Sequence, residues 1–144
     1  MNHLELLLIE DNAADAKLAI RALRKMYPNL AIWHAHDGQE ALDLVLDPAT
    51  KPNEKTKPPG LIFLDLKLPK INGLQVLEKI RQNKQTRAIP VIVLSSSNEI
   101  SDIETAYQLG ANSYITKPVG FEEYEQLIAT LGSYWLELNQ SPVL

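Results

Sequence analysis

Leu61-Ile62-Phe63-Leu64-Asp65-Leu66-Lys67-Leu68-Pro69-Lys70-Ile71-Asn72-Gly73 is the stretch that decides the fold, because four apolar residues run directly into a carboxylate. Pro58-Pro59-Gly60 precedes the apolar run and Pro69 follows it. A short apolar run without polar alternation predicts a strand that is covered on both faces. Ligands of parallel α/β sheets bind at the carboxyl ends of the strands, so Asp65 is a functional candidate. The alternative is an ordinary acid that only begins the loop through an Asx-turn.

The whole-chain composition predicts a soluble, cytoplasmic protein of one domain. The chain has 144 residues, 45% of them hydrophobic, which is ordinary for one globular domain. Its net charge of −4 and its lack of a long Lys/Arg block argue against nucleic acid as a partner. Without cysteine, neither disulfides nor thiolate metal sites can form, which fits a reducing interior. Glu5 and Glu10 bracket the early apolar run, so we expect neither a signal peptide nor a membrane partner.

Strand and helix patterns alternate five times along the chain. Predicted strands cover residues 6–9, 30–35, 61–64, 91–94 and 113–115, and apolar residues at helical spacing cover 14–27, 39–46, 74–83, 100–109 and 121–139. Asn12 or Asp15 is expected to cap the first helix. In the fourth helix the residues at core spacing are Ile100, Ile103, Ala106 and Tyr107. This order predicts an α/β fold, a flavodoxin-like doubly wound parallel sheet of five strands in the order 2-1-3-4-5.

Two segments depart from that regular pattern. Residues 47–60 contain four prolines and three lysines, so we predict an exposed surface insertion. The last helix, at about 121–139, is long for so small a core and carries Tyr134, Trp135 and Leu138 in its distal part. These three side chains are candidates for a contact surface. The alternative is that they cover the lower edge of the core.

The predicted strand order brings chemically active residues to one edge of the sheet. The tips of strands 1, 3, 4 and 5 carry Glu10, Asp11, Asp65, Ser95 and Lys117. Three carboxylates at one pocket repel one another unless a proton or a cation neutralises them, and hard oxygen ligands suit Mg²⁺. We expect Asp11 and Asp65 to be direct ligands, Glu10 to act through water, and the backbone carbonyl of Lys67 to complete the protein's share.

Beside a cation, Asp65 becomes a nucleophile that can accept a phosphoryl group. Lys117 and the Ser95 hydroxyl, from the next two strand tips, could each bind one phosphoryl oxygen. Such a site works by positioning and electrostatic stabilisation. Taken singly, Ser95 would be an ordinary strand-end hydroxyl and Lys117 a solvated charge, so the prediction depends on their joint placement.

These residues resemble the receiver domain of bacterial two-component response regulators, the CheY-like superfamily, over nearly the whole chain. The matching elements are Glu10-Asp11, Asp65 with Pro69 and Gly73 after it, Ser95, and Lys117-Pro118. The resemblance implies that a histidine kinase phosphorylates Asp65, that Mg²⁺ is required, and that Ser95 and Lys117 bind the phosphoryl group. The domain would then be a signalling module and not an enzyme acting on other substrates.

The resemblance also implies two conformational features. The peptide bond between Lys117 and Pro118 is expected to be cis, which proline permits at modest cost. Tyr114 stands where the family has an aromatic residue that changes rotamer together with Ser95 on phosphorylation, a two-state element biased by one charge. The alternative is that Tyr114 lies on the sheet edge without switching.

The insertion at 47–60 and the long aromatic last helix look like the stand-alone regulators of cyanobacterial and bacterial phytochromes. That narrower resemblance implies a light-regulated phytochrome histidine kinase as partner. It also implies a homodimer through the face formed by the fourth helix, fifth strand and fifth helix. The six residues after Leu138 are too few for an output domain, so we expect the output to be a contact made by this domain itself.

Three alternatives remain beside the receiver hypothesis. A phosphatase of the haloacid dehalogenase type also uses an Asp after a buried strand, but it needs a second Asp two residues on, where this chain has Lys67. A flavodoxin-like cofactor binder would need a Gly/Ser/Thr-rich first loop, whereas residues 10–13 are acidic and would repel phosphate. A receiver-like module that binds partners without phosphorylation is the third. Lys67 also suggests an altered lifetime of the phosphorylated form, because it places a cation beside Asp65.

Overall fold

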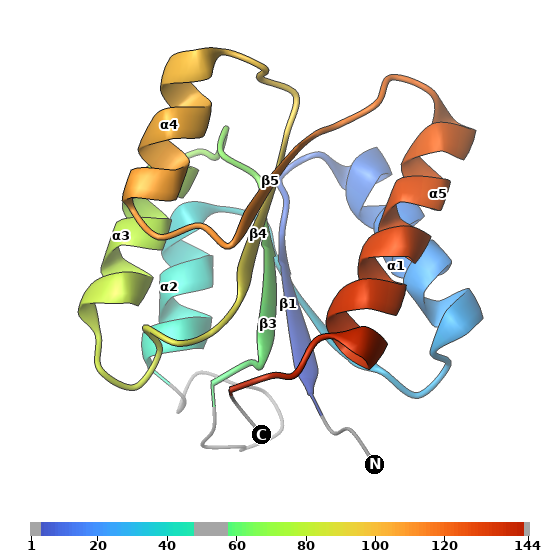
Figure 1. Ribbon diagram of the computed structural model, residues 1–144, viewed down its shortest axis with the longest axis horizontal. Coiled ribbons are helices and arrows are strands. Elements are labelled where there is room, and N and C mark those ends of the chain that lie inside the picture. Colours follow the sequence, from blue (N-terminus) through green and yellow to red (C-terminus); the bar gives the residue numbers. More distant parts are fainter. Residues whose placement is uncertain (1–3, 48–57, 143–144) are drawn as a thin grey trace.

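The computed structural model describes residues 4–47 and 58–142, which fold around one parallel sheet (Figure 1). Its strands are β1 (Glu5–Ile9), β2 (Ala31–Ala35), β3 (Leu61–Leu64), β4 (Val91–Ser95) and β5 (Ser113–Thr116). They are all parallel and stand in the order β2-β1-β3-β4-β5. The predicted fold class and strand order are therefore confirmed.

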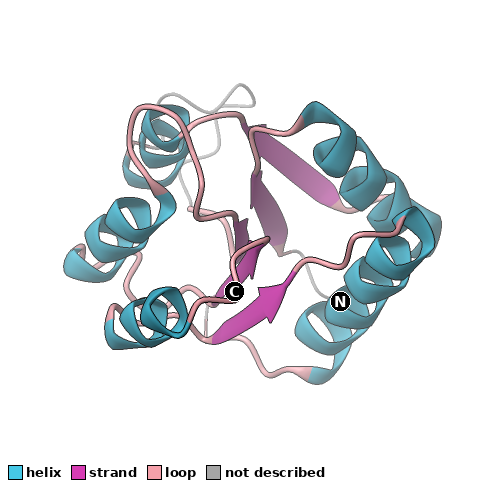
Figure 2. Cartoon of the chain, turned by 90° about the horizontal axis from the view of Figure 1, so that it is seen from above, coloured by secondary structure: helices cyan, strands magenta, loops and turns pink. Residues whose placement is uncertain are grey.

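Helices cover both faces of the sheet (Figures 1 and 2). They are α1 (Ala13–Met26), α2 (Gly38–Leu46), α3 (Gly73–Gln82), α4 (Ile100–Gln108) and α5 (Phe121–Gly132), which continues as the π-helix η2 (Ser133–Leu138). One face carries α1 and α5, and the opposite face carries α2, α3 and α4. None of the helices in the described part of the chain is long and apolar enough to cross a bilayer.

The apolar runs of the central strands are explained by this two-sided cover. Successive side chains of a strand point to opposite faces. Leu6 and Leu8 therefore pack with α1 and α5, whereas Leu7 and Ile9 pack with α2 and α3. Because both faces are dry, neither set can be polar, and no alternation remains in the sequence.

The loops that follow the strands are held by side-chain caps. Asn12 Oδ1 accepts from Asp15 N at 3.0 Å, so Asn12 is the cap of α1 and Asp15 lies in its first turn. Asn72 and Gln75 form a reciprocal capping box at the start of α3. The caps fix where α1 and α3 begin, so the three residues 10–12 after β1 and the eight residues 65–72 after β3 form the loops at the carboxyl edge of the sheet.

The fourth helix is less buried than its spacing predicts. Ile100 is 72% exposed and Tyr107 is 49% exposed, and of this helix Ala106 alone is buried. The expectation that Ile100 and Tyr107 belong to the core is wrong. The physical reason is that α4 covers only the margin of the sheet, where Ala106 packs against Leu66 and Val93.

The distal part of the last helix supports each of the two interpretations for different side chains. Leu136 is buried in the core, and Trp135 packs against that core while partly exposed. Tyr134 is 48% exposed and Leu138 is 69% exposed. The distal segment therefore both covers the core and presents Tyr134 and Leu138 to solvent, and the use of these side chains as a contact surface stays a prediction.

The predicted insertion at 47–60 lies mostly outside the described residues. At its end, the expectation of exposure is wrong, because Pro59 and Gly60 are buried. Gly60 N donates to Glu5 O at 2.9 Å, which extends the β1–β3 pairing backwards by one step. A Cβ on Gly60 would collide with the end of the buried Leu4 side chain, so a larger residue where the chain enters β3 would require Leu4 to shift.

Candidate phosphoacceptor and cation site

The carboxylates converge because β1 and β3 are neighbours in register. Ile9 pairs with Leu64, so Glu10 and Asp65 follow side by side, and Asp65 N donates to Ile9 O at 3.0 Å. Only 2% of Glu10 and 7% of Asp65 is exposed. Two acids are therefore fixed at the end of the sheet with little access to water.

Asp11 adds an exposed carboxylate to this pair. One carboxylate oxygen each from Glu10, Asp11 and Asp65 lies within 4.8 Å of the other two. Oxygen donors in such a group suit a hard divalent cation such as Mg²⁺, and the crowded negative charge favours one. The predicted acidic residues thus fit a cation, and which of them bind it directly stays a prediction.

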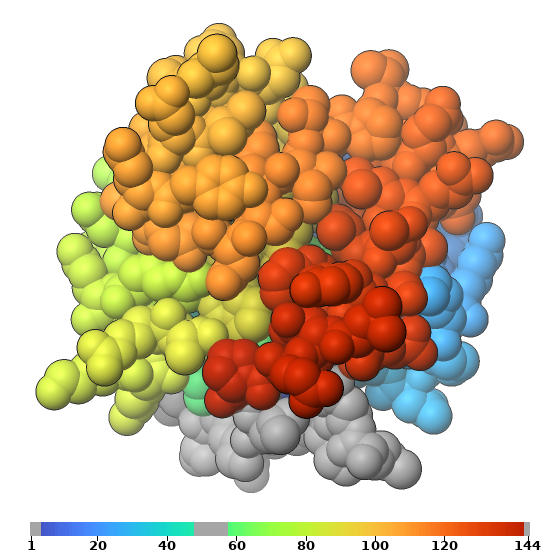
Figure 3. Space-filling view, viewed as in Figure 1, coloured from blue at the N-terminus to red at the C-terminus, as the bar shows by residue number. Residues whose placement is uncertain are grey.

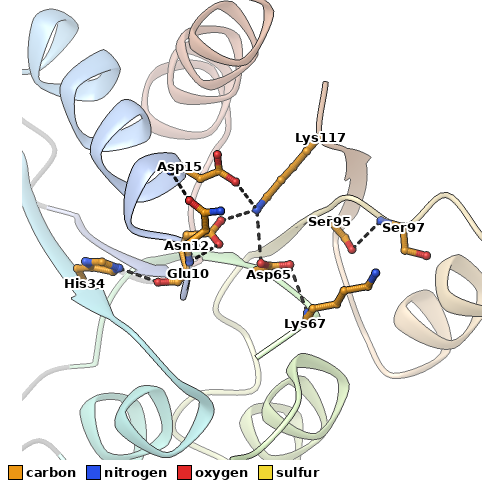
Figure 4. Close-up of polar contacts among 9 residues, drawn as sticks. All are labelled: Glu10, Asn12, Asp15, His34, Asp65, Lys67, Ser95, Ser97 and Lys117. Carbon is orange, nitrogen blue, oxygen red and sulfur yellow. Dashed lines mark hydrogen bonds and ion pairs between the residues drawn. The ribbon is translucent and has the colours of Figure 1, made fainter. Parts of the chain in front are cut away.

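The loop after β3 closes back onto Asp65. Lys67 N donates to Asp65 Oδ1 at 3.3 Å, while the Lys67 side chain is exposed (Figure 4). The hydrogen bond fixes the backbone of Lys67 beside the carboxylate. It is compatible with a cation contact from the Lys67 carbonyl, which remains an expectation.

Lys117 links the tips of three elements (Figure 4). Its Nζ lies 2.6 Å from Glu10 Oε1, 3.2 Å from Asp15 Oδ2 and 3.4 Å from Asp65 Oδ2. The side chain of Lys117 is 10% exposed. Its backbone N donates to Ser95 O at 2.8 Å, so the pairing of β5 with β4 holds the lysine at this edge.

Burial and charge act on this group together. Burial raises the pKa of Glu10 to about 7, against the hydrogen bond from Lys117, and the charge of Asp65 acts in the same direction as burial. For Lys117, burial lowers the pKa, but the hydrogen bond to Glu10 and the charge of Asp65 outweigh it and raise the pKa overall. The lysine therefore stays charged, and the site keeps a cation available for an anionic group on Asp65.

Ser95 does not contact Asp65 or Lys117 by a side-chain hydrogen bond within the described chain. It is fully buried, and its Oγ accepts from Ser97 N at 3.1 Å. Ser97 Oγ in turn donates to Asp102 Oδ2 at 2.6 Å. The structure places Ser95 at the same edge as Asp65 and ties its hydroxyl into the loop before α4.

Tyr114 contacts this same loop. Its Oη donates to Ser97 O at 2.8 Å, and its backbone N donates to the hydroxyl of Tyr107 at 3.1 Å. The ring packs against the small cluster around Val93 and Ala106. Tyr114 is thus positioned to respond to movement of Ser97, and its role as a switch stays a prediction.

The expectation of a cis peptide bond before Pro118 is wrong for this structure. The described chain contains no cis peptide, so the bond between Lys117 and Pro118 is trans. The trans form is the intrinsically favoured isomer of an X-Pro bond by about 0.5–1 kcal/mol. In this isomer Lys117 still reaches Glu10 and Asp65.

Two residues of the site were not predicted as part of it. Asp15 was considered only as a possible cap, yet its carboxylate contacts Lys117; its place in the first turn after β1 was the available signal. Tyr124 lies within the apolar helical pattern at 121–139 and was not singled out as a site residue. Its buried hydroxyl has no hydrogen-bond partner in the described structure, and burial raises its pKa, with Lys117, Glu10, Asp15 and Asp65 all close enough to influence it.

The fold and the site together define a doubly wound α/β domain with a group of carboxylates that could hold a cation and a largely buried lysine at the carboxyl edge of its sheet. The family model described as response regulator receiver domain matches residues 6–129. The chain therefore belongs to the response regulator receiver family.

Three relatives show how far the similarity extends. The probable methanogenesis regulatory protein FilR2 of Methanothrix harundinacea is 37% identical over 95% of this chain and 86% of its own length. Response regulator Rcp1 of Synechocystis is 33% identical over 95% and 92%, and its Mn²⁺-bound structure has a TM-score of 0.88 at 97% and 99% coverage. The phosphorylated cyanobacterial phytochrome response regulator RcpA is 33% identical, with a TM-score of 0.90 and coverage of 98% and 99%. Similarity thus reaches phytochrome response regulators over nearly their full length.

Proposed function

We propose that the protein is a response regulator that accepts a phosphoryl group on Asp65 from a histidine kinase in a Mg²⁺-dependent reaction. The observation that carries this proposal is the contact of one largely buried lysine, Lys117, with both Glu10 and Asp65. A nucleophilic carboxylate, oxygen ligands for a cation and a fixed ammonium are the parts that phosphoryl transfer requires.

The two carboxylate oxygens of Asp65 have different neighbours. Oδ1 accepts from Lys67 N, and Oδ2 is the oxygen nearest to Lys117. Attack of one carboxylate oxygen on phosphorus forms the acyl phosphate bond as the bond from phosphorus to the donor's imidazole nitrogen breaks. A cation held by Glu10, Asp11 and Asp65 would supply charge neutralisation of the phosphoryl oxygens. Lys117 would bind another phosphoryl oxygen, and the Ser95 hydroxyl would have to exchange its bond with Ser97 N for one to the phosphoryl group.

A phytochrome histidine kinase is the partner that the relatives favour. RcpA is a phytochrome response regulator, and its similarity in structure covers 98% of this chain. Under this proposal the kinase delivers the phosphoryl group to the edge of the sheet where Asp65 lies. The added charge on Asp65 would then shift the loop from Ser95 to Ser97, and Tyr114 would respond because its hydroxyl donates to Ser97 O.

Phosphorylation can be tested with a small phosphodonor. Purified protein is incubated with acetyl phosphate and Mg²⁺, and the phosphoform is separated by phosphate-affinity electrophoresis. Asp65→Asn should abolish a phosphoform that is labile in both acid and base, as an acyl phosphate is, whereas Asp43→Asn on α2 changes the charge equally and should keep it. An acid-stable phosphoform, or phosphate retained by Asp65→Asn, would contradict the assignment. Turnover of a phosphomonoester would favour the phosphatase alternative, and absence of any phosphoform in the parent would favour the module that binds without phosphorylation.

We infer further that the protein forms a homodimer through the face of α4, β5 and α5. The elements α4, β5 and α5 lie toward the viewer in Figure 3. Tyr107 on α4 and Tyr134 and Leu138 on the last helix are exposed and supply apolar surface to these elements. Tyr134 also stacks edge-on against Trp135, with ring centroids 5.0 Å apart, which holds the tyrosine in place. Tyr134→Ala should weaken self-association in sedimentation velocity, whereas Met26→Ala on α1 should not. A parent protein that is monomeric, or a dimer unaffected by Tyr134→Ala, would overturn this inference.

A further inference from the structure

We propose that Asp15 is a positioning residue that holds Lys117 in a resting arrangement and releases it when Asp65 carries a phosphoryl group. The proposal rests on the function proposed above, since it concerns the lysine of the same site. It assigns a fourth carboxylate, outside the cation group of Glu10, Asp11 and Asp65, to control of the lysine.

The first observation is that the hydrogen-bonding capacity of Lys117 is fully used. An ammonium group has three N–H donors and no acceptor. Its three hydrogen bonds go to Glu10 at 2.6 Å, Asp15 at 3.2 Å and Asp65 at 3.4 Å (Figure 4). A new phosphoryl oxygen can bind Lys117 only if one of these acceptors gives up its donor.

The second observation decides which contact is released. The side chain of Glu10 is only 2% exposed, so losing Lys117 would leave a buried acceptor without its donor. The side chain of Asp15 is 32% exposed, so water can replace the ammonium there at small cost. The donor that Lys117 now gives to Asp65, the longest of the three contacts at 3.4 Å, passes to the phosphoryl group on that carboxylate. The ammonium must move to follow the phosphoryl oxygen, and of the two acceptors that remain Asp15 is the one that can yield as it moves.

The third observation is that the backbone of Asp15 is fixed. Its N–H donates to the side chain of Asn12, the cap of α1, so this residue is anchored in the first turn of the helix. Its carboxylate consequently stays near the site after the lysine has moved. It then competes for the ammonium and repels the phosphoryl oxygens, and both effects oppose the phosphorylated state.

The removal of this carboxylate should therefore favour binding of a phosphoryl analogue. Asp15→Asn is expected to raise the affinity for beryllofluoride in the presence of Mg²⁺ about two- to fivefold, the range set by partly exposed ion pairs. The phosphoform made with acetyl phosphate should be populated more strongly in the same variant. Asp43→Asn on α2 is the control for the change in net charge and should bind the analogue as the parent does.

Two measurements separate a contact with Lys117 from a general effect of charge. Without metal, the side-chain ¹⁵Nζ resonance of Lys117 should shift in Asp15→Asn relative to the parent. In Asp43→Asn the same resonance should stay where it is in the parent. In a Lys117→Met background, Asp15→Asn should no longer raise the affinity for the analogue, as a double-mutant cycle requires for a direct interaction. An unshifted Lys117 resonance, or an unchanged affinity in a parent that does bind beryllofluoride, would overturn the role of Asp15. A parent that binds no beryllofluoride would instead contradict the proposed function, while the resonance would still report on the Asp15 contact.

Discussion

Gly73, the first residue of α3, is expected to be indispensable for the geometry of Asp65. Its N–H donates to Leu66 O at 2.8 Å, which closes the loop from β3 to α3. A Cβ at this position would lie 2.6 Å from Leu66 Cα and 3.1 Å from the carbonyl carbon of Asp65, and still closer to the carbonyl oxygen of Asp65. Ordinary carbon–carbon contacts are about 3.5–4.0 Å, so the backbone beside the phosphoacceptor would have to move by about 1 Å in Gly73→Ala.

The size of the effect follows from this collision. Overpacking against a fixed backbone costs about 1–3 kcal/mol. For a chain of this length that loss lowers the melting temperature by about 3–12 °C, measured by circular dichroism. A displacement of about 1 Å at a reacting group can cost a factor of about 100 in rate. We therefore expect phosphorylation by acetyl phosphate to slow far more than the loss of stability alone would explain at 25 °C, where the variant is still folded.

Gly120→Ala is the matched control for this prediction. A Cβ on Gly120 would meet only the end of the flexible Glu123 side chain, which can turn away. The free energy of unfolding of this variant should lie within about 0.5 kcal/mol of the parent's, and the variant should be phosphorylated at the parent's rate. A Gly73→Ala protein with the stability and the phosphorylation rate of the parent would refute the argument from close packing.

Three further predictions concern single side chains of the site. Lys67→Ala and Lys67→Asn should change the lifetime of the phosphoform, and an unchanged dephosphorylation rate would contradict a role for the exposed cation beside Asp65. The raised pKa of Glu10, from 4.5 to about 7, means that the metal-free folded state keeps a proton that the unfolded state releases between these pH values. The free energy of unfolding should therefore fall by up to about 3 kcal/mol as pH rises through that window. Urea titrations with chelator should show this fall in the parent but not in Glu10→Gln, and equal pH profiles for the two proteins would contradict the prediction. Tyr124→Phe removes a buried hydroxyl that has no partner in the described structure, so the free energy of unfolding should stay equal or rise by about 1 kcal/mol, and a clear loss would reveal a bond made by that hydroxyl.

The strands were predictable because burial on both faces leaves a mark in the sequence. The short unbroken runs at 61–64 and 91–94, each preceded by proline, predict strands covered on two sides, and each run leads to a residue that the site uses. The alternation of strands and helices then leaves few possible topologies. From these the meeting of Glu10, Asp11, Asp65 and Lys117 at one edge could be predicted before any contact was known.

Only the tertiary structure decided how much of each helix is buried and which partner each polar group has. The spacing of α4 is that of a core helix, but its place at the margin of the sheet leaves Ile100 and Tyr107 exposed. The contact of Asp15 with Lys117 joins residues 102 positions apart in the chain. A sequence pattern shows the period of a helix, but it does not show which residue of another element a helical side chain contacts. That contact depends on the register of β1, β4 and β5 and on the angle at which α1 starts. The apolar pattern of this chain therefore determines the sheet and its reactive edge, and three-dimensional packing determines the resting position of the lysine within it.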